Sequence, residues 1–192
     1  MKKSILVLYL FFIINSLCSC YTLETNITSN NLHNIFKKFI SGEQTAVDNQ
    51  DNNIMISKYT FDKTSKYTFF DINKDGKEEL LIKSNESLDI FTLKDNSLYL
   101  VIELPTYYMP LNNGAFLYVR DGAAPEHTDY IYTILNTDGE KLFEQSFSEY
   151  KISDTEIKYF LNNIETSKKI FDSVSKPIFK IDNDKIKWQN LK

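Results

Sequence analysis

The sequence has only two cysteines, Cys18 and Cys20, and both lie close to the N-terminus. The residues after Cys20 therefore contain no thiol, which excludes an intramolecular disulfide and a metal site built from thiolates in that part of the chain. Histidine is equally scarce, with His33 and His127 as the two copies. Neither a Gly-x-Ser-x-Gly nucleophile motif nor a glycine-rich phosphate loop is present. The sequence thus offers few of the patterns that mark an enzyme.

A strong charge of either sign is also absent. The formal net charge is −4 over 192 residues, and 25% charged with 42% hydrophobic residues is an ordinary composition for a globular protein. A mildly acidic surface argues against nucleic acid and anionic lipid headgroups as partners. The length suits one domain with a substantial core.

The N-terminal segment combines positive charge with a short apolar stretch. Lys2 and Lys3 precede an apolar run from Ile5 to Ile14. This run is shorter than the roughly 20 residues that a membrane-spanning helix needs. Charge followed by a short apolar core is typical of a secretory signal peptide.

The end of this segment, Leu17-Cys18-Ser19-Cys20, resembles a bacterial lipobox. By this resemblance, residues 1–19 are a lipoprotein signal peptide and Cys20 is the first residue of the mature chain, carrying fatty-acid chains such as palmitate. The resemblance implies an extracytoplasmic protein that is anchored to a bacterial membrane or cell surface through the lipid on Cys20. Cys18 fits less well, because Leu17 and not a small residue precedes it. An ordinary cleaved signal peptide with incidental cysteines is the alternative.

The segment 71–79 has the spacing of a calcium loop. Oxygen-bearing side chains fall at its first, third and fifth positions, and Gly76 follows directly. Alternate residues of a calcium loop direct oxygens inward, and the glycine permits a sharp turn. The seventh position contributes a backbone carbonyl. The candidate calcium ligands are Asp71, Asn73, Asp75, Lys77 through its backbone, and Glu79.

The loop departs from an EF-hand at its twelfth position, where Ile82 replaces the bidentate glutamate. Aromatic residues 67–70 precede the loop and aliphatic residues 80–82 follow it, which indicates a strand on each side. Residues 68–83 resemble the calcium loops of FG-GAP and VCBS-type repeats, and a loop of lipid-anchored proteins from low-GC bacteria. The resemblance implies calcium in a structural role, bound at about 10⁻⁴–10⁻³ M as in extracellular modules. The alternative is a polar hairpin turn, because Asp, Asn and Gly also form turns.

The remaining pattern predicts an α+β fold, an antiparallel β-meander sheet with one amphipathic helix near each end. Residues 20–31 form a polar tether, and residues 32–192 form a single domain. Apolar positions recur with helical spacing over 32–40, and a Ser153/Glu156 capping box precedes a second helical pattern over 157–164. The repeated pentapeptides 57–61 and 65–69 predict a hairpin. Residues 178–181 and 185–188 predict another pair of strands.

Candidate catalytic residues gather in the segment 121–129, which is expected to be the longest irregular stretch inside the sheet. Glu126, His127 and Asp129 there have the chemistry of an acid-base or metal cluster, while an ordinary polar loop is the alternative. His33 falls on the polar side of the first helix, where a solvated side chain is expected. Tyr107 and Tyr108 form either an aromatic platform for sugar or peptide, or part of the hairpin packing.

Two functions follow from these patterns. The favoured one is a membrane-anchored, calcium-stabilised binding or interaction module without enzymatic activity, whose protein or glycan partner the sequence does not identify. The alternative is a small cell-envelope hydrolase that uses the 121–129 loop.

Overall fold

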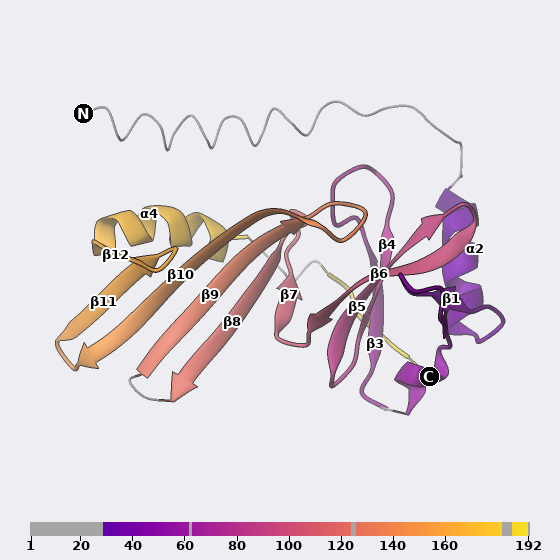
Figure 1. The fold of residues 1–192 in the computed structure, drawn as a ribbon, viewed down its shortest axis with the longest axis horizontal. Coiled ribbons are helices and arrows are strands. Elements are labelled where there is room, and N and C mark those ends of the chain that lie inside the picture. Colours follow the sequence, from indigo (N-terminus) through magenta and orange to yellow (C-terminus); the bar gives the residue numbers. More distant parts are fainter. Residues whose placement is uncertain (1–28, 62, 124–125, 182–185, 192) are drawn as a thin grey trace.

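Two β-sheets organise the part of the chain that the computed structural model describes, namely residues 29–61, 63–123, 126–181 and 186–191. Within these residues, sheet A consists of β1 (Ala46–Val47), β2 (Asn53–Ile54), β3 (Lys66–Phe70), β4 (Glu79–Lys83), β5 (Ser87–Lys94), β6 (Ser97–Pro105) and β13 (Gln189–Asn190). Sheet B consists of β7 (Tyr108–Pro110), β8 (Phe116–Ala123), β9 (Glu126–Leu135), β10 (Lys141–Ser153), β11 (Glu156–Leu161) and β12 (Ile164–Thr166). The two sheets lie side by side along the long axis of the molecule (Figure 1).

The strands β3 to β6 form a meander in sheet A, and the strands β7 to β12 form a meander in sheet B. Sheet A has the order β13-β3-β4-β5-β6-β1-β2, and sheet B has the order β12-β11-β10-β9-β8-β7. Neighbouring strands are antiparallel except β1 and β6, which pair in parallel. After sheet B is complete, the chain returns to sheet A, where β13 pairs with β3.

The helix α2 (Ser29–Ile40) covers one face of sheet A. Its apolar residues repeat with a period near 3.6, so that Leu32, Phe36 and Phe39 fall on one side and are buried. Phe36 stacks on Phe69 of β3 with ring centroids 5.6 Å apart, and Phe39 packs against Phe91 of β5. The predicted first helix is therefore confirmed.

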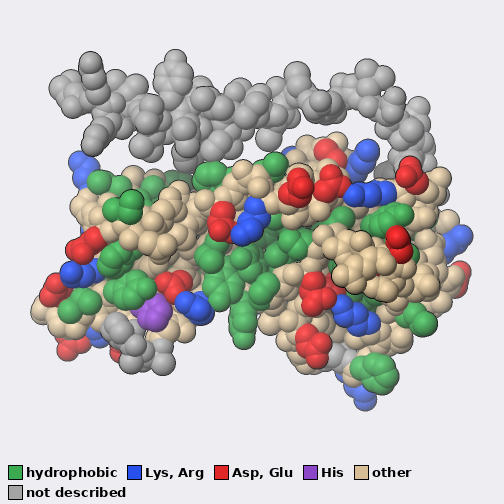
Figure 2. All heavy atoms as spheres, viewed as in Figure 1, with side chains coloured by type: hydrophobic (Ala, Val, Ile, Leu, Met, Phe, Trp, Pro, Cys, Tyr) green, Lys and Arg blue, Asp and Glu red, His purple; other side chains and the backbone are tan. Residues whose placement is uncertain are grey.

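The opposite face of sheet A packs against the near end of sheet B. Leu81, Leu88 and Ile90 from sheet A share a buried cluster with Phe116 of β8 and Leu135 of β9. This cluster joins the two sheets. Figure 2 shows apolar side chains gathered in the middle of one face, where the two sheets meet.

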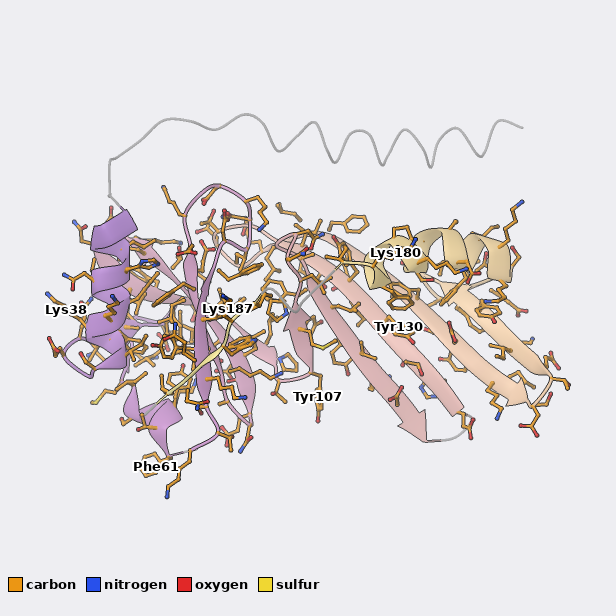
Figure 3. All side chains as sticks on the ribbon, turned by 180° about the vertical axis from the view of Figure 1, so that it is seen from behind. Lys38, Phe61, Tyr107, Tyr130, Lys180 and Lys187 are labelled. Carbon is orange, nitrogen blue, oxygen red and sulfur yellow. The ribbon has the colours of Figure 1, made fainter. Side chains whose placement is uncertain are left out.

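The helix α4 (Lys168–Phe179) covers one face of sheet B. Ser167 caps its N-terminus by accepting a hydrogen bond from the Ile170 backbone amide. Phe171 of the helix is buried against Phe147 of β10, and Tyr130 of β9 contacts Phe179. Figure 3 labels Tyr130 and, at the end of the helix, Lys180. The other face of sheet B has no helix over it among the described residues.

The α+β class, with antiparallel sheets and a helix toward each end, is confirmed, but the predictions for residues 157–164 and 178–181 are wrong. Residues 157–164 form β11 and β12 and not a helix, because Phe160 pairs with Ser148 and Leu161 with Phe147. The Ser153/Glu156 pattern flanks the two-residue turn of a hairpin instead of capping a helix. The second helix lies later, at 168–179, so the predicted strand at 178–181 is also wrong.

The predicted hairpin between 57–61 and 65–69 is wrong in its first half. Ser57–Thr60 form a short helix, α3, while the second copy of the pentapeptide contributes to β3. Tyr59 of α3 is 1% exposed and packs against sheet A. The same five residue types therefore take two structures, and tertiary packing decides which one forms.

The predicted signal peptide (residues 1–19), the lipidation site Cys20 and most of the predicted tether lie outside the described residues. Among the residues that are described, none of the helices has the length and apolar character needed to cross a membrane.

Candidate metal centre

The loop between β3 and β4 is held together by hydrogen bonds from its own backbone to its side chains. Asp71 accepts from the backbone amides of Asp75 (3.2 Å) and Gly76 (3.0 Å). Asn73 accepts from the amide of Asp75 at 3.0 Å, and Asp75 accepts from the amide of Lys77 at 2.8 Å. The oxygens of the first, third and fifth positions therefore face the inside of the loop.

Two backbone positions of the loop have positive φ angles. Gly76 has φ +86°, a region that glycine enters without steric cost, and an added Cβ would meet no neighbour there. Lys74 has φ +61°, which is uncommon for a residue with a side chain. The Lys74 ammonium lies 4.9 Å from the centre of the Phe70 ring, a cation–π contact that helps to hold this conformation.

Glu79, the ninth position of the loop, is the first residue of β4 and only 1% exposed. Its carboxylate accepts a hydrogen bond from the backbone amide of Ile72 at 3.0 Å. Burial raises the pKa of Glu79 to about 8, the amide of Ile72 partly opposes this, and the negative charges of Asp75 and Asp71 raise the pKa further. The loop therefore has the carboxyl groups of Asp71 and Asp75 close to a buried one, Glu79, for which burial favours the uncharged form near neutral pH.

The donor set fits calcium in its chemistry, since it offers carboxylate and amide oxygens, which this hard cation prefers. The structure brings Asp71, Asn73 and Asp75 together around the loop interior, and the carboxylate of Glu79 reaches the backbone of the same loop. No three His, Cys, Asp or Glu side chains of the described residues form a ready-made metal cluster. A metal at this loop would therefore depend on Asn73 and on the Lys77 backbone carbonyl as well as on carboxylates.

His33 is not the solvated helix residue that the sequence suggests. Its Nε2 lies 2.6 Å from the Glu78 carboxylate, and its ring centroid is 4.6 Å from that of Phe69. The contact joins α2 to the end of the loop, directly before Glu79. Helical periodicity places His33 on the polar side of α2 and gives no signal for a partner 45 positions away.

The segment 121–129 is also different from the prediction. It is a β-hairpin formed by the end of β8 and the start of β9, and not a long irregular loop. Because side chains alternate along a strand, Glu126 and His127 point to opposite faces of sheet B. The Glu126 carboxylate lies 3.3 Å from the Lys151 ammonium, whereas Nε2 of His127 lies 3.4 Å from the Asp129 carboxylate. The structure therefore brings His127 and Asp129 together, while Glu126 lies on the other face of the sheet.

Packing accounts for the position of His127. Its ring stacks on Tyr150 with centroids 4.8 Å apart and planes inclined by 7°. On its other side it lies so close to Gly122 that a Cβ at that glycine would collide with the ring. The Asp129 carboxylate accepts a hydrogen bond from the Arg120 guanidinium at 2.8 Å. Burial opposes the charge of Asp129, but the hydrogen bonds from Arg120 and Ser148 hold its pKa below the ordinary value.

The two adjacent tyrosines have different environments. Tyr107 is 64% exposed and extends outward between the two sheets (Figure 3). Tyr108 is half-buried and packs against the core cluster that joins the sheets. Both rings contact Tyr118, with centroids 6.2 Å and 5.1 Å away.

A buried carboxylate in sheet A was not predicted from the sequence. Asp89 of β5 is fully buried and accepts hydrogen bonds from the Tyr59 hydroxyl and, at 3.0 Å, from the Lys58 ammonium. The Lys58 ammonium also donates a hydrogen bond to the carboxylate of Glu103 on β6 at 2.9 Å. Burial and the charge of Asp89 raise the pKa of Tyr59 above its ordinary value. The only sequence signal is an acidic residue next to the apolar residues Leu88, Ile90 and Phe91.

Comparison with known proteins gave no relative: no family model matches the chain, and no match was found among curated proteins or solved structures.

Proposed function

We propose that this chain is a membrane-anchored extracytoplasmic lipoprotein whose folded part is a calcium-stabilised binding or interaction module. The observation that carries the metal assignment is the arrangement of Asp71, Asn73 and Asp75, whose side-chain oxygens all face the inside of one loop. The lipobox resemblance at Cys20 supports the anchor. Outside the cytoplasm calcium is plentiful, so the two assignments support each other.

In this role the cation neutralises the carboxylates of Asp71 and Asp75 and links the end of β3 to the start of β4. Both strands pack beneath α2, since Phe69 and Leu80 belong to the core cluster that contains this helix. A metal at the loop would therefore stabilise the folded state and not take part in a reaction. A separate surface is left to bind the partner, which is a protein or a glycan.

We expect calcium to raise the melting temperature of the purified chain by about 3–10 °C at 10 mM, if the dissociation constant is about 10⁻⁴–10⁻³ M. Asp71→Asn combined with Asp75→Asn should abolish this rise, because the loop then offers two neutral amides in place of carboxylates. Thermal unfolding followed by circular dichroism, with calcium and with a chelator, measures both effects.

A matched control is the pair Asp95→Asn and Asp154→Asn, which removes the same charge from two exposed turns. This control should keep the calcium effect. A parent protein whose melting temperature does not respond to calcium would refute the metal assignment, as would an equal response in the Asp71/Asp75 variant.

Replacing Cys20 by serine should move the protein from the membrane fraction to the soluble fraction, because the fatty-acid chains lose their attachment site. Cys18→Ser is the matched control and should leave the protein with the membrane. Fractionation and immunoblotting of cells that express each variant measure the distribution. Retention of the Cys20→Ser protein on the membrane would contradict the lipid anchor.

A further inference from the structure

Two lysines face each other near one edge of sheet A. Lys66 of β3 lies directly opposite Lys83 of β4 in the antiparallel register. Side chains at such positions have Cβ atoms about 4.5–5.5 Å apart, and like charges there destabilise the pairing. Neither lysine forms an ion pair with a carboxylate within the described part of the chain. The register of the sheet therefore places two positive charges side by side.

Both lysines line a cavity of about 290 Å³, and Trp188 forms another part of its wall. The register of β13 against β3 pairs Asn190 with Lys66, which places Trp188 on the same face of the sheet as Lys66. Trp188 also packs against the core cluster that joins the two sheets, so the ring is fixed in place. Figure 3 shows the C-terminal segment, marked by Lys187, running along sheet A.

The other lining residues are neutral and polar: Thr64, Ser84, Asn85 and Thr106. They hold the rim of the cavity in shape. Thr106 donates a hydrogen bond to the carbonyl of Ser84 at 3.1 Å, and Thr64 donates one to Asn85 at 3.1 Å. None of the described lining residues is acidic, although the whole chain has a net charge of −4. Among the described residues, the lining of the cavity thus has two positive charges and no negative one.

We propose that this cavity binds a small acidic sugar, with its carboxylate or phosphate between Lys66 and Lys83 and its ring against Trp188. The two ammonium groups supply charge-assisted hydrogen bonds to the anion and relieve their own repulsion when it binds. The indole offers a flat apolar surface to the sugar ring, and the hydroxyl and amide groups of the rim suit its hydroxyls. The volume is close to the lower end of the range for small-ligand sites, about 300–1,000 Å³, which fits a single sugar unit.

This site adds a ligand to the binding role proposed above, and it shares no residue with the calcium loop. The two assignments can therefore fail separately. The Asp71→Asn/Asp75→Asn variant should bind the acidic sugar as the parent does, in calcium or in chelator, at a temperature where both are folded.

Trp188 is the only tryptophan of the chain, so its fluorescence reports directly on the cavity. The full chain, purified in detergent, should show a saturable change in emission with glucuronate or with glucose 6-phosphate, and none with glucose. The two acidic probes distinguish a carboxylate ligand from a phosphate ligand. Lys66→Gln and Lys83→Gln should each weaken binding about tenfold. Lys38→Gln, on α2 and away from Lys187 (Figure 3), removes the same charge and should have no effect.

The proposal would be overturned if neither acidic probe changed the fluorescence at concentrations up to about 10 mM, a dissociation constant at the weak end of specific binding. Equal binding of glucose would also overturn it, because the lysines would then have no role. So would unchanged affinity in the two lysine variants, whose folding can be checked by circular dichroism. Affinity that falls as salt is raised supports the ionic contact.

Discussion

Replacing Phe147 by alanine will lower the free energy of unfolding by about 3–5 kcal/mol, the usual cost of removing a buried aromatic ring. Phe147 is 1% exposed and lies at the centre of the contact between sheet B and α4. Its ring stacks on Tyr130 at 5.1 Å and meets Phe171 and Phe179 edge-on at 6.0 Å and 5.7 Å. These four rings come from β9, β10 and α4, so a cavity at this point loosens the helix from the sheet.

Phe160→Ala is the matched control, because it removes the same ring from the neighbouring strand β11. Phe160 points to the uncovered face of sheet B, is only partly buried and contacts Tyr150. Its loss should cost about 1 kcal/mol, since much of the ring already faces water. Urea unfolding followed by circular dichroism measures both variants. Equal destabilisation by the two substitutions would contradict the assignment of this core.

Replacing Lys58 by methionine will destabilise the protein by about 2–3 kcal/mol. The substitution removes the cation that faces Asp89, whose carboxylate is fully buried under α3. Breaking a buried ion pair by removing one partner costs about 3–5 kcal/mol. We expect a smaller value here, because the Lys58 side chain is 41% exposed and solvent screens part of the interaction.

The triple variant Lys58→Met/Asp89→Leu/Tyr59→Phe should recover most of this loss, to within about 1 kcal/mol of the parent, because no buried charge or hydroxyl is left without a partner. Glu103→Gln is the control for the exposed half of the network. It breaks the second ion pair of Lys58 and should cost less than about 1 kcal/mol. A triple variant that is less stable than Lys58→Met would show that the buried carboxylate stabilises the fold by itself.

Periodic patterns in the sequence identified the elements whose local preference agrees with their packing. The helix over 32–40 and the strands on each side of the 71–79 loop are examples. The pattern failed where packing overrides local preference. Ser57–Thr60 are helical because Tyr59 is buried against sheet A, although the same sequence is extended in β3. Phe160 and Leu161 belong to the helical pattern over 157–164, but they lie on opposite faces of a strand that pairs with β10.

The candidate metal loop was found from the sequence because its residues are neighbours in the chain. Contacts between distant segments were not found, and they include the His33–Glu78 contact and the Lys58–Asp89 ion pair. The Lys66/Lys83 pair depends on the register between β3 and β4 and could not be deduced from residue types alone. Sites that need one strand to be placed against another are therefore the ones that a single sequence conceals.

The return of the chain to sheet A sets an order on folding. Pairing of β13 with β3 joins residues that are distant in the sequence, such as Tyr67 and Gln189, which are separated by 122 positions. Contacts of such long range form slowly, because a large loop must be closed first. Sheet B and α4 lie within that loop, and their folding shortens the freely moving chain and lowers the entropic cost of closure. Until then β3 keeps an unpaired edge, which is open to pairing with a strand of a second chain.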